Sequence, residues 1–242
     1  MKQYSVIIPA FNAAYTLNEL IDKIRGLDSP PEEILVVNDG STDQTSQKAR
    51  NERISVIDIS TNQGKGWALK TGFEHYLGQK HKGFVICMNA DLQHPPEYIP
   101  QFINYAHSTG CHFVIGNRSK KPGEMPLHRI MSNRITSFII SKITGQSIFD
   151  SQCGFRLIDI DIVKNLDLVE KGFQLESEMI LKAAEQGVEI GFVPIPVIYH
   201  NTGSHIGNFR DTVKFVRMVL KYLLGRHKVM NRHRVNSSPG RG

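Results

Sequence analysis

The sequence contains few cysteines and no long apolar run. Its 242 residues include only Cys87, Cys111 and Cys153, which are widely spaced and belong to no CxxC or Cys/His group. Scattered cysteines in an odd number argue against a disulfide framework and a zinc site, and they favour a reducing compartment. No apolar stretch approaches the roughly 20 residues that a membrane-spanning helix needs, and Pro9 interrupts the first apolar run before a signal-peptide core could form. We therefore expect a cytoplasmic protein that does not itself cross a membrane.

Two common nucleotide-binding motifs are missing as well. No GxGxxG follows the first β-rich run, and GxxxxGK[ST] occurs nowhere in the chain. Rossmann dehydrogenases and P-loop kinases depend on these glycines to bring backbone close to phosphates, so both classes are excluded. What remains is an ordinary globular composition, with 40% hydrophobic and 21% charged residues, which suits one large domain with or without an appendage.

Positive charge is concentrated toward the C-terminal end. Residues 205–242 contain nine Lys and Arg but one acidic residue, Asp211. Four basic residues are spaced there by four, three and four positions, so they share one side of a helix whose other positions are mostly apolar: Arg210, Lys214, Arg217 and Lys221. Such a helix can lie on an anionic membrane surface or against a membrane-bound partner. Nucleic acid is not expected as a partner, because no aromatic and basic platform accompanies the charge.

Strand-like and helix-like segments alternate over the first 118 residues, which is typical of βαβ units around a mostly parallel sheet. The strand-like runs are YSVIIPA, EILVVND, ISVIDIS, GFVICMN and HFVIGNR. The second half is less regular. It predicts helices at about 127–144 and 175–186 and a last β-rich run, VEIGFVPIPVIY.

Polar turns follow three of these strands, at the edge of an open α/β sheet where ligands bind. NDGSTD places Asp39 where its carboxylate suits the N–H of a nucleobase or a ribose hydroxyl, and Ser41 and Thr42 can cap the next helix. NADLQHPP places Asp91 and Gln93 two residues apart, so both can point to one side and share a hard divalent cation. Mg²⁺ or Mn²⁺ there would bridge the phosphates of a nucleoside diphosphate and neutralise charge on the leaving group.

Six segments occur in a telling order and spacing: VIIPAFNA, VVNDGSTD, NQGKGWAL, NADLQHPP, GNR and DSQCGFRL. Over residues 3–225 the chain resembles glycosyltransferase family 2, especially the polyprenyl-phosphate sugar transferases of the dolichol-phosphate mannose and glucose synthase type. The resemblance implies a GT-A fold, an α/β nucleotide-diphospho-sugar transferase fold with a mostly parallel central sheet flanked by helices. We accordingly expect a GT-A catalytic domain at 1–205, an amphipathic basic membrane-proximal helix at 206–228 and a disordered basic tail at 229–242.

The same resemblance implies roles for individual residues. Asp91 and Gln93 match the family's catalytic metal and diphosphate ligands, with Mg²⁺ or Mn²⁺ as the cofactor. The pocket for a UDP- or GDP-linked sugar is matched by Pro9, Phe11, Asp39, Lys65, Asn89, Ala90 and Asp91. For the acceptor phosphate, two arginines match by position, two further residues lie on the same predicted helix, and a histidine stands where relatives often have Lys: Arg118 and Arg129, Asn133 and Arg134, and His205.

Two positions depart from the family's pattern. The family usually writes DADLQHPP, and here the first carboxylate is replaced by Asn89; it usually writes PxYNE, and here the acidic position is Ala13. Asn89 still offers a carbonyl oxygen. With one negative charge fewer, we expect weaker cation binding and more reliance on the nucleotide's phosphates.

Two further segments add candidates whose roles stay open. Asp150, in DSQCGFRLID, could orient the acceptor arginines, reach the sugar or belong to a structural turn. In FQLESEMILK, Glu176 or Glu178 could be the base that a hydroxyl acceptor requires. A phosphate acceptor is already ionised and needs no base.

We therefore expect an inverting, metal-dependent, hexosyltransferase-like enzyme of cell-envelope polysaccharide or glycolipid synthesis. It would move a sugar from a nucleoside diphosphate sugar to undecaprenyl or dolichyl phosphate at the cytoplasmic membrane face. Its expected partners are those two substrates and a membrane surface or membrane-bound subunit, with a homo-oligomer left open. One alternative is transfer to a saccharide hydroxyl with Glu176 or Glu178 as base. Another is a weakly catalytic, nucleotide-sugar-binding partner subunit.

Overall fold

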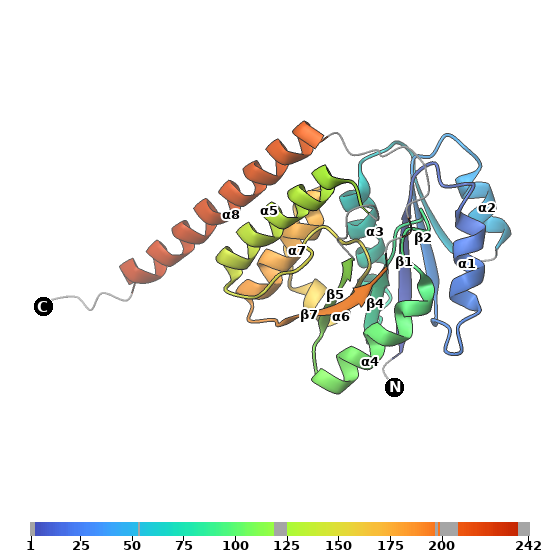
Figure 1. Cartoon of the computed structure of the whole chain (residues 1–242), viewed down its shortest axis with the longest axis horizontal. Coiled ribbons are helices and arrows are strands. Elements are labelled where there is room, and N and C mark those ends of the chain that lie inside the picture. The colour runs from blue at the N-terminus through green and yellow to red at the C-terminus, as the bar shows by residue number, and fades with distance from the viewer. Residues whose placement is uncertain (1–2, 53, 119–124, 197, 199–207, 237–242) are drawn as a thin grey trace, which may run out of the picture. The chain divides into compact units, whose positions relative to one another are not determined.

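The computed structural model describes residues 3–52, 54–118, 125–196, 198 and 208–236. The chain divides into two compact units, Met1–Thr202 and Gly203–Gly242 (Figure 1). Within the described residues, the first unit contains every strand and all helices except the last.

Seven strands of the described chain form one mixed sheet, in the order β3-β2-β1-β4-β6-β5-β7. Neighbouring strands are parallel except at β6, which runs antiparallel between β4 and β5. The strands are β1 (Tyr4–Ala10), β2 (Ile34–Asp39), β3 (Ser55–Ile59), β4 (Phe84–Cys87), β5 (Phe113–Arg118), β6 (Arg156–Asp159) and β7 (Ile190–Ile195). β1, β2 and β4 are buried along their whole length, which is typical of parallel strands covered on both faces.

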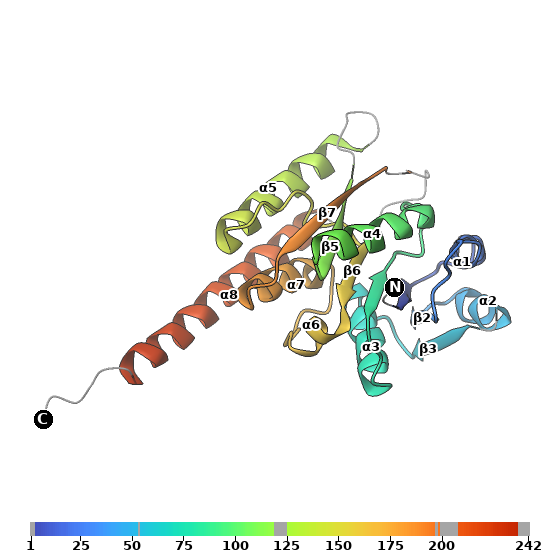
Figure 2. The ribbon, with the colours of Figure 1, turned by 90° about the horizontal axis from the view of Figure 1, so that it is seen from below.

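Helices cover both faces of this sheet. α1 and α4 lie on one face, and α3 and α6 lie on the other (Figure 2). The helices are α1 (Leu17–Arg25), α2 (Thr45–Asn51), α3 (Lys65–Gly78), α4 (Ile99–Thr109), α5 (Leu127–Thr144), α6 (Ile160–Lys164) and α7 (Gln174–Glu185). In α1 the four residues at helical spacing, Leu17, Leu20, Ile21 and Ile24, are all buried against the sheet. The predicted mostly parallel sheet flanked by helices is therefore confirmed.

The candidate site residues converge because of the strand directions. The carboxyl ends of β1, β2, β4 and β5 share one edge of the sheet. β6 begins at that edge, since it is antiparallel, and its first residue Arg156 pairs with Cys87 of β4 and Ile115 of β5. The segment before β6, which contains Asp150 and Gly154, consequently arrives beside the loops that follow the parallel strands. Ligands of open α/β sheets bind at this edge.

The five strand-like runs and the two helices expected in the second half are confirmed. β6 and α6 were not predicted. β6 is only four residues long and fully buried, so its RLID sequence shows no alternation of apolar and polar residues. α6 is five residues long, too short for an apolar stripe to identify it.

The last helix, α8, spans Asn208–Asn236. It therefore ends eight residues after position 228, and residues 229–236 are helical rather than part of the expected disordered tail. No Gly or Pro interrupts the chain between Gly225 and Pro239, and Arg, Lys and Met favour helix, which accounts for the extension. The rest of the expected tail, 237–242, lies outside the described residues. No helix in the described part of the chain is both long enough and apolar enough to span a bilayer.

Candidate active site

The loops after β1 and β2 are fastened to each other by side-chain hydrogen bonds. Asn12 adopts a left-handed φ of 51°. Its N–H donates to Ser41 Oγ at 2.9 Å, and its Oδ1 accepts from the N–H of Thr42 at 2.9 Å. Ser41 and Thr42 therefore do not cap α2, contrary to the prediction. α2 begins later, at Thr45, whose N–H donates to the carboxylate of Asp43 at 2.9 Å.

Asp39, the last residue of β2, is buried and holds the loop before α3. Its two carboxylate oxygens accept from the N–H groups of Gln63 and Gly64, each at 2.8 Å. Gly64 has a φ of 102°, a conformation that favours glycine. Asp39 thus fixes the turn that starts α3 at Lys65. Contact of this carboxylate with a nucleotide stays a prediction.

Pro9 and Phe11 lie at the end of β1. Pro9 pairs with Val37 of β2, but β4 pairs with β1 only as far as Ile7, so the missing N–H of Pro9 costs no bond to β4. Phe11 follows the strand and is 38% exposed. It lies at the edge formed by the carboxyl ends of the parallel strands, called the ligand edge below. Contact of this ring with a nucleobase stays a prediction.

The turn after β4 carries the predicted cation ligands. Leu92 adopts a left-handed φ of 56°, which reverses the chain sharply between Asp91 and Gln93. One carboxylate oxygen of Asp91 accepts from the N–H of Gln93 at 3.1 Å. The carbonyl of Ala90 accepts from Thr16 Oγ1 at 2.5 Å, which ties this turn to α1. The turn is therefore held by its own side chains and by a neighbouring loop.

The residues of this turn suit a hard divalent cation. Asn89 Oδ1 is buried and has no hydrogen-bond partner within the described chain, and such an orphaned carbonyl oxygen requires a ligand, a water or an ion. Carboxylate and amide oxygens are the donors that Mg²⁺ and Mn²⁺ prefer. No group of three His, Cys, Asp or Glu that could hold a metal occurs among the described residues. The set predicted from the sequence accordingly consists of one carboxylate and two amides.

In the segment before β6, Asp150 organises two of the predicted acceptor residues. Asp150 is fully buried. It accepts from Nε and Nη2 of Arg118 at 2.7 and 2.8 Å and from Nδ2 of Asn133 at 2.8 Å. Asp150 therefore orients Arg118, and the contact of this arginine with an acceptor stays a prediction. Arg118 and Asn133 are thus brought together from β5 and α5.

The other acceptor candidates are placed differently. Arg129 is half-buried, one turn before Asn133 on α5. Arg134 is exposed and points away from the buried side of the helix that holds Asn133. His205 lies outside the described residues.

Two glutamates considered as bases differ in their surroundings. Glu176, in the first turn of α7, is buried and pairs with Lys65, with 2.5 Å between Nζ and Oε1. Glu178 accepts from the N–H groups of Val169 and Glu170 and pairs with Lys182, so its carboxylate is occupied by structure. Only Glu176 lies with a predicted site residue.

Two residues of this region were not singled out from the sequence. Arg156 is buried, and its guanidinium donates to the carbonyls of Ser151, Cys153 and Glu176. It joins the segment before β6 to the first turn of α7. His94 is also buried, and burial, together with Arg118 and Lys65, lowers its pKa to about 3. Arg156, a lone charge inside the apolar run CGFRLI, offered a signal, whereas His94 is ordinary in a turn.

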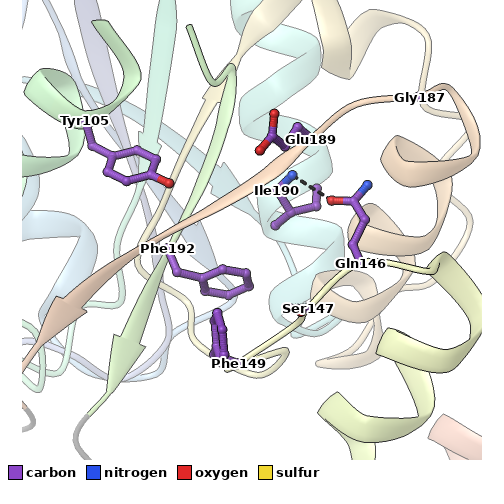
Figure 3. A pocket seen from close by; sticks show the side chains of 8 residues that line it. All are labelled: Tyr105, Gln146, Ser147, Phe149, Gly187, Glu189, Ile190 and Phe192. Carbon is purple, nitrogen blue, oxygen red and sulfur yellow. Dashed lines mark hydrogen bonds between the residues drawn. The ribbon is translucent and has the colours of Figure 1, made fainter. Parts of the chain in front are cut away.

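A cavity of about 480 Å³ lies elsewhere (Figure 3). It is lined by residues from α4, the segment after α5 and the start of β7: Tyr105, Gln146, Ser147, Phe149, Gly187, Glu189, Ile190 and Phe192. Gln146 Oε1 accepts from the N–H of Ile190 at 2.9 Å across its floor (Figure 3). Ile190 pairs with Phe113 at the start of β5, so this cavity lies toward the amino end of the parallel strands. It is separate from the candidate active site.

The strand order and the convergence of these loops define a GT-A nucleotide-diphospho-sugar transferase fold. The chain belongs to glycosyltransferase family 2, because the model of the family Glycosyl transferase family 2 matches residues 5–167, more than half of its length. The family recognised from the six sequence segments is therefore confirmed.

Individual relatives agree with this assignment. An uncharacterized protein of Methanocaldococcus jannaschii is 32% identical over 80% of this chain and 81% of its own length. A dolichol-phosphate mannosyltransferase of Pyrococcus furiosus is 34% identical over 78% of this chain, although the match spans 55% of that protein. It supports the likeness to polyprenyl-phosphate sugar transferases.

Solved structures agree on the fold. Glucosyl-3-phosphoglycerate synthase from Mycobacterium tuberculosis, in complex with Mn²⁺, uridine diphosphate and glucosyl-3-phosphoglycerate, superposes with a TM-score of 0.70. The superposition covers 93% of this chain and 80% of that one, at 19% sequence identity. At that identity the likeness establishes the GT-A fold.

Proposed function

We propose that this protein is a divalent-cation-dependent glycosyltransferase that moves a sugar from a UDP- or GDP-linked donor to a polyprenyl phosphate. The reaction takes place at the cytoplasmic membrane face and inverts the anomeric centre. Membership of family 2 and the likeness to a dolichol-phosphate mannosyltransferase support the reaction class. The solved enzyme of the same fold with bound Mn²⁺ and uridine diphosphate supports the cation and the donor.

One observation favours a lipid acceptor over a soluble one. α5 carries the acceptor candidates Arg129 and Asn133, and it also exposes a stripe of large apolar side chains, spaced by four, four and three positions: Leu127, Met131, Ile135 and Phe138. These side chains are 66, 63, 55 and 62% exposed. Contiguous exposed apolar surface of this kind marks an interaction site. A helix that binds a phosphate and presents an apolar stripe suits a phosphate attached to a hydrocarbon chain at a membrane surface.

The basic helix α8 supports the same location. Between positions 213 and 224 of this helix, Lys214, Arg217 and Lys221 share one side, and apolar residues fill the remainder. Each Lys or Arg near an anionic surface contributes on the order of 1 kcal/mol. Co-sedimentation with anionic vesicles should therefore fall when these three residues are replaced by Gln. Unchanged sedimentation at low salt would exclude this contact.

In the proposed reaction, an oxygen of the acceptor phosphate forms a bond to the anomeric carbon. The bond from that carbon to the donor's diphosphate breaks, and the nucleoside diphosphate leaves with the electron pair. Asp91, Gln93 and Asn89 would hold the cation, which offsets negative charge on the leaving diphosphate. Arg118, fixed by Asp150, and Arg129 would hold the acceptor phosphate. No general base takes part, because the attacking oxygen is already ionised.

The test is to incubate the protein with radiolabelled nucleotide sugars and undecaprenyl or dolichyl phosphate, and to measure label in the organic phase. Replacement of Met131 and Ile135 by Ser should reduce transfer to polyprenyl phosphate in vesicles. Val169→Ser is a matched control, because Val169 and Ile135 are equally exposed, at 55%. Transfer that requires Mn²⁺ and depends on the stripe would support the proposal. Label that stays in the aqueous phase as a glycosylated soluble acceptor would overturn the lipid acceptor.

A second candidate is transfer to a hydroxyl group of a saccharide or other soluble acceptor. The position of Glu176 favours it, since this buried carboxylate lies at the ligand edge while Glu178 is occupied. Under this reading Glu176→Gln would reduce turnover at saturating substrate and remove the basic group from the pH profile. A weakly catalytic binding subunit would instead show nucleotide-sugar binding with no transfer to either acceptor class.

A further inference from the structure

The turn after β4 lacks a negative charge that the family's motif supplies. Asn89 stands where that motif has a carboxylate, so Asp91 is the one charged residue in the predicted ligand set. Asn89 Oδ1 nevertheless points to a buried place with no partner in the described chain. The predicted cation site therefore has one carboxylate fewer than the family's motif supplies. A neighbouring acidic side chain could provide the missing charge.

Gly154 shows which side chains meet at that place. A Cβ on Gly154 would lie 2.5 Å from Asn89 Oδ1, 2.7 Å from Lys65 Nζ and 3.0 Å from Glu176 Oε1. The three atoms come from the turn after β4, the start of α3 and the first turn of α7. The three atoms crowd the Cα of Gly154 so closely that a side chain at position 154 would force them to move. Asn89 and Glu176 therefore present oxygens to one small volume.

We infer that Glu176 supplies the second carboxylate of the cation site, in place of the carboxylate missing at position 89. Lys65 neutralises Glu176 until the cation and the nucleotide diphosphate bind. This inference rests on the proposed cation-dependent function and names a further residue of that site. It gives the cation two carboxylates, Asp91 and Glu176, which is the number that the family's motif provides through DAD.

The surroundings of Glu176 fit this role. The side chains of Lys65 and Glu176 are only 14 and 5% exposed, so their charges are poorly screened by water. A divalent cation at Glu176 repels the Lys65 ammonium, and the diphosphate that arrives with it offers Lys65 a new anionic partner. Arg156 donates to the carbonyl of Glu176 and so fixes the backbone from which the carboxylate extends. The ion pair is thus positioned to exchange partners when the donor binds.

The inference is tested without turnover by titrating Mn²⁺ alone into the full chain. The electron paramagnetic resonance signal of the free ion gives the Mn²⁺ affinity. Glu176→Gln should weaken Mn²⁺ binding about tenfold. Asn89→Asp should strengthen Mn²⁺ binding. In the Asn89→Asp background, Glu176→Gln should reduce the Mn²⁺ affinity less than it does in the original protein. Lys65→Met should strengthen Mn²⁺ binding, because it removes the cation that competes for Glu176. Glu185→Gln, an exposed glutamate of the same helix, is the matched control.

The outcomes separate this inference from the proposed function. Unchanged Mn²⁺ affinity in Glu176→Gln, or an equal loss in Glu176→Gln and Lys65→Met, overturns the inference. If Glu176→Gln does not fold, as judged by its thermal melting, the increase expected in Lys65→Met still decides the matter. Loss of Mn²⁺ binding in Asp91→Ala but not in Glu176→Gln contradicts the role of Glu176 and still supports the proposed cation site. No effect of Asp91→Ala on Mn²⁺ binding contradicts the proposed cation site as a whole.

Discussion

The two sides of the ligand edge are stabilised by different interactions. On the donor side, after β1 and β2, the carboxylates of Asp39 and Asp43 accept hydrogen bonds from main-chain N–H groups. On the predicted acceptor side, around β5 and β6, the carboxylate of Asp150 pairs with Arg118, and in α7 that of Glu176 pairs with Lys65, a residue of the predicted nucleotide pocket. The donor side is therefore fixed in shape by its backbone. The acceptor side is held by ion pairs between largely buried side chains.

The pKa of Asp43 illustrates the donor-side arrangement. Burial would raise the pKa of this carboxyl, but hydrogen bonds from Thr45 and from the N–H of Ala14 outweigh burial and lower it. The charge is thus stabilised by hydrogen-bond donors of the neighbouring loops and of the start of α2. At Arg118 and Lys65, in contrast, the predicted anionic ligands would compete directly with the carboxylates of Asp150 and Glu176.

The largest effect is expected at Asp91, which lies between the two sides. Asp91→Ala should reduce turnover about 10³-fold, because it removes the one charged residue of the turn predicted to hold the cation. The fold should be unchanged, since the side chain is partly exposed and accepts a hydrogen bond from the N–H of Gln93, two residues away. Turnover and thermal melting measure the two effects. Asp28→Ala, an exposed change between α1 and β2, is the control, and near-normal turnover of Asp91→Ala would disprove the metal role.

Arg156 provides the next largest effect and probes stability on the acceptor side. Arg156→Met should lower the free energy of unfolding by about 3 kcal/mol, because three buried carbonyls lose their donor. The loss is partly offset, since burial lowers the pKa of this guanidinium and so shows the cost of a buried charge. Chemical denaturation measures the change. Arg134→Met, at an exposed position of α5, is the control. Equal stability of the two variants would show that Arg156 does not organise this side.

The same contrast explains what could be predicted from the sequence. Between Tyr4 and Arg118 apolar strands alternate with helices, so β1 to β5 were predicted correctly and the polar turns after three of them were located. On the acceptor side β6 is short, antiparallel and introduced by an irregular segment. The side chains of this region pair with residues far away in the chain, as Glu176 does with Lys65. Periodicity carries no information about such pairs.

Individual site residues show the same limit. The positions of Asp91, Gln93 and Asn89 in one turn follow from their spacing, and they are indeed together at a sharp reversal. In contrast, Ser41 and Thr42 were predicted as helix caps because their residue types favour caps, but the loop after β1 competes for them through Asn12. Tertiary hydrogen bonds overrode the local preference.

Arg118 and Arg129 test whether the acceptor side recognises an anion. Arg129→Ala should raise the apparent requirement for polyprenyl phosphate about thirtyfold and change that for nucleotide sugar little, because one charge-assisted contact to the phosphate is lost. Steady-state kinetics with each substrate varied in turn gives both values.

At position 118 the single change would leave the buried carboxylate of Asp150 without its arginine. Arg118→Ala should therefore be made together with Asp150→Asn, which removes that buried charge. An equal effect on the two substrates would argue against an acceptor role for either arginine.

The smallest effect concerns His94, which lies in the same turn after β4 as Asp91 and whose pKa is lowered by burial and by nearby positive charge. Burial, then the positive charges of Arg118 and Lys65, lower its pKa from 6.5 to about 3, and the negative charge of Asp150 opposes this with a smaller effect. In the unfolded chain the imidazole binds a proton below about pH 6.5, whereas in the folded chain it stays neutral to about pH 3. Its contribution to stability is therefore complete above pH 6.5 and is lost as the pH falls from 6.5 toward 3. At most 1 proton is involved, so between pH 7 and pH 5 the unfolding free energy should fall by about 2 kcal/mol on its account.

His94→Phe removes the titrating group and keeps an aromatic ring against Phe155, which lies 6.0 Å away between ring centroids. Denaturation at pH 7 and pH 5 should then show a smaller loss of stability than in the original protein, by about that same 2 kcal/mol. His128→Phe, at an exposed position, provides the control. The comparison is sharpened by repeating the measurement with Lys65→Met, which removes one of the two cations and should raise the pKa of His94 and narrow the pH window. If the pH dependence of stability is the same with and without His94, its pKa is not lowered in the folded protein, and neither burial nor the charges of Arg118 and Lys65 act on it as expected.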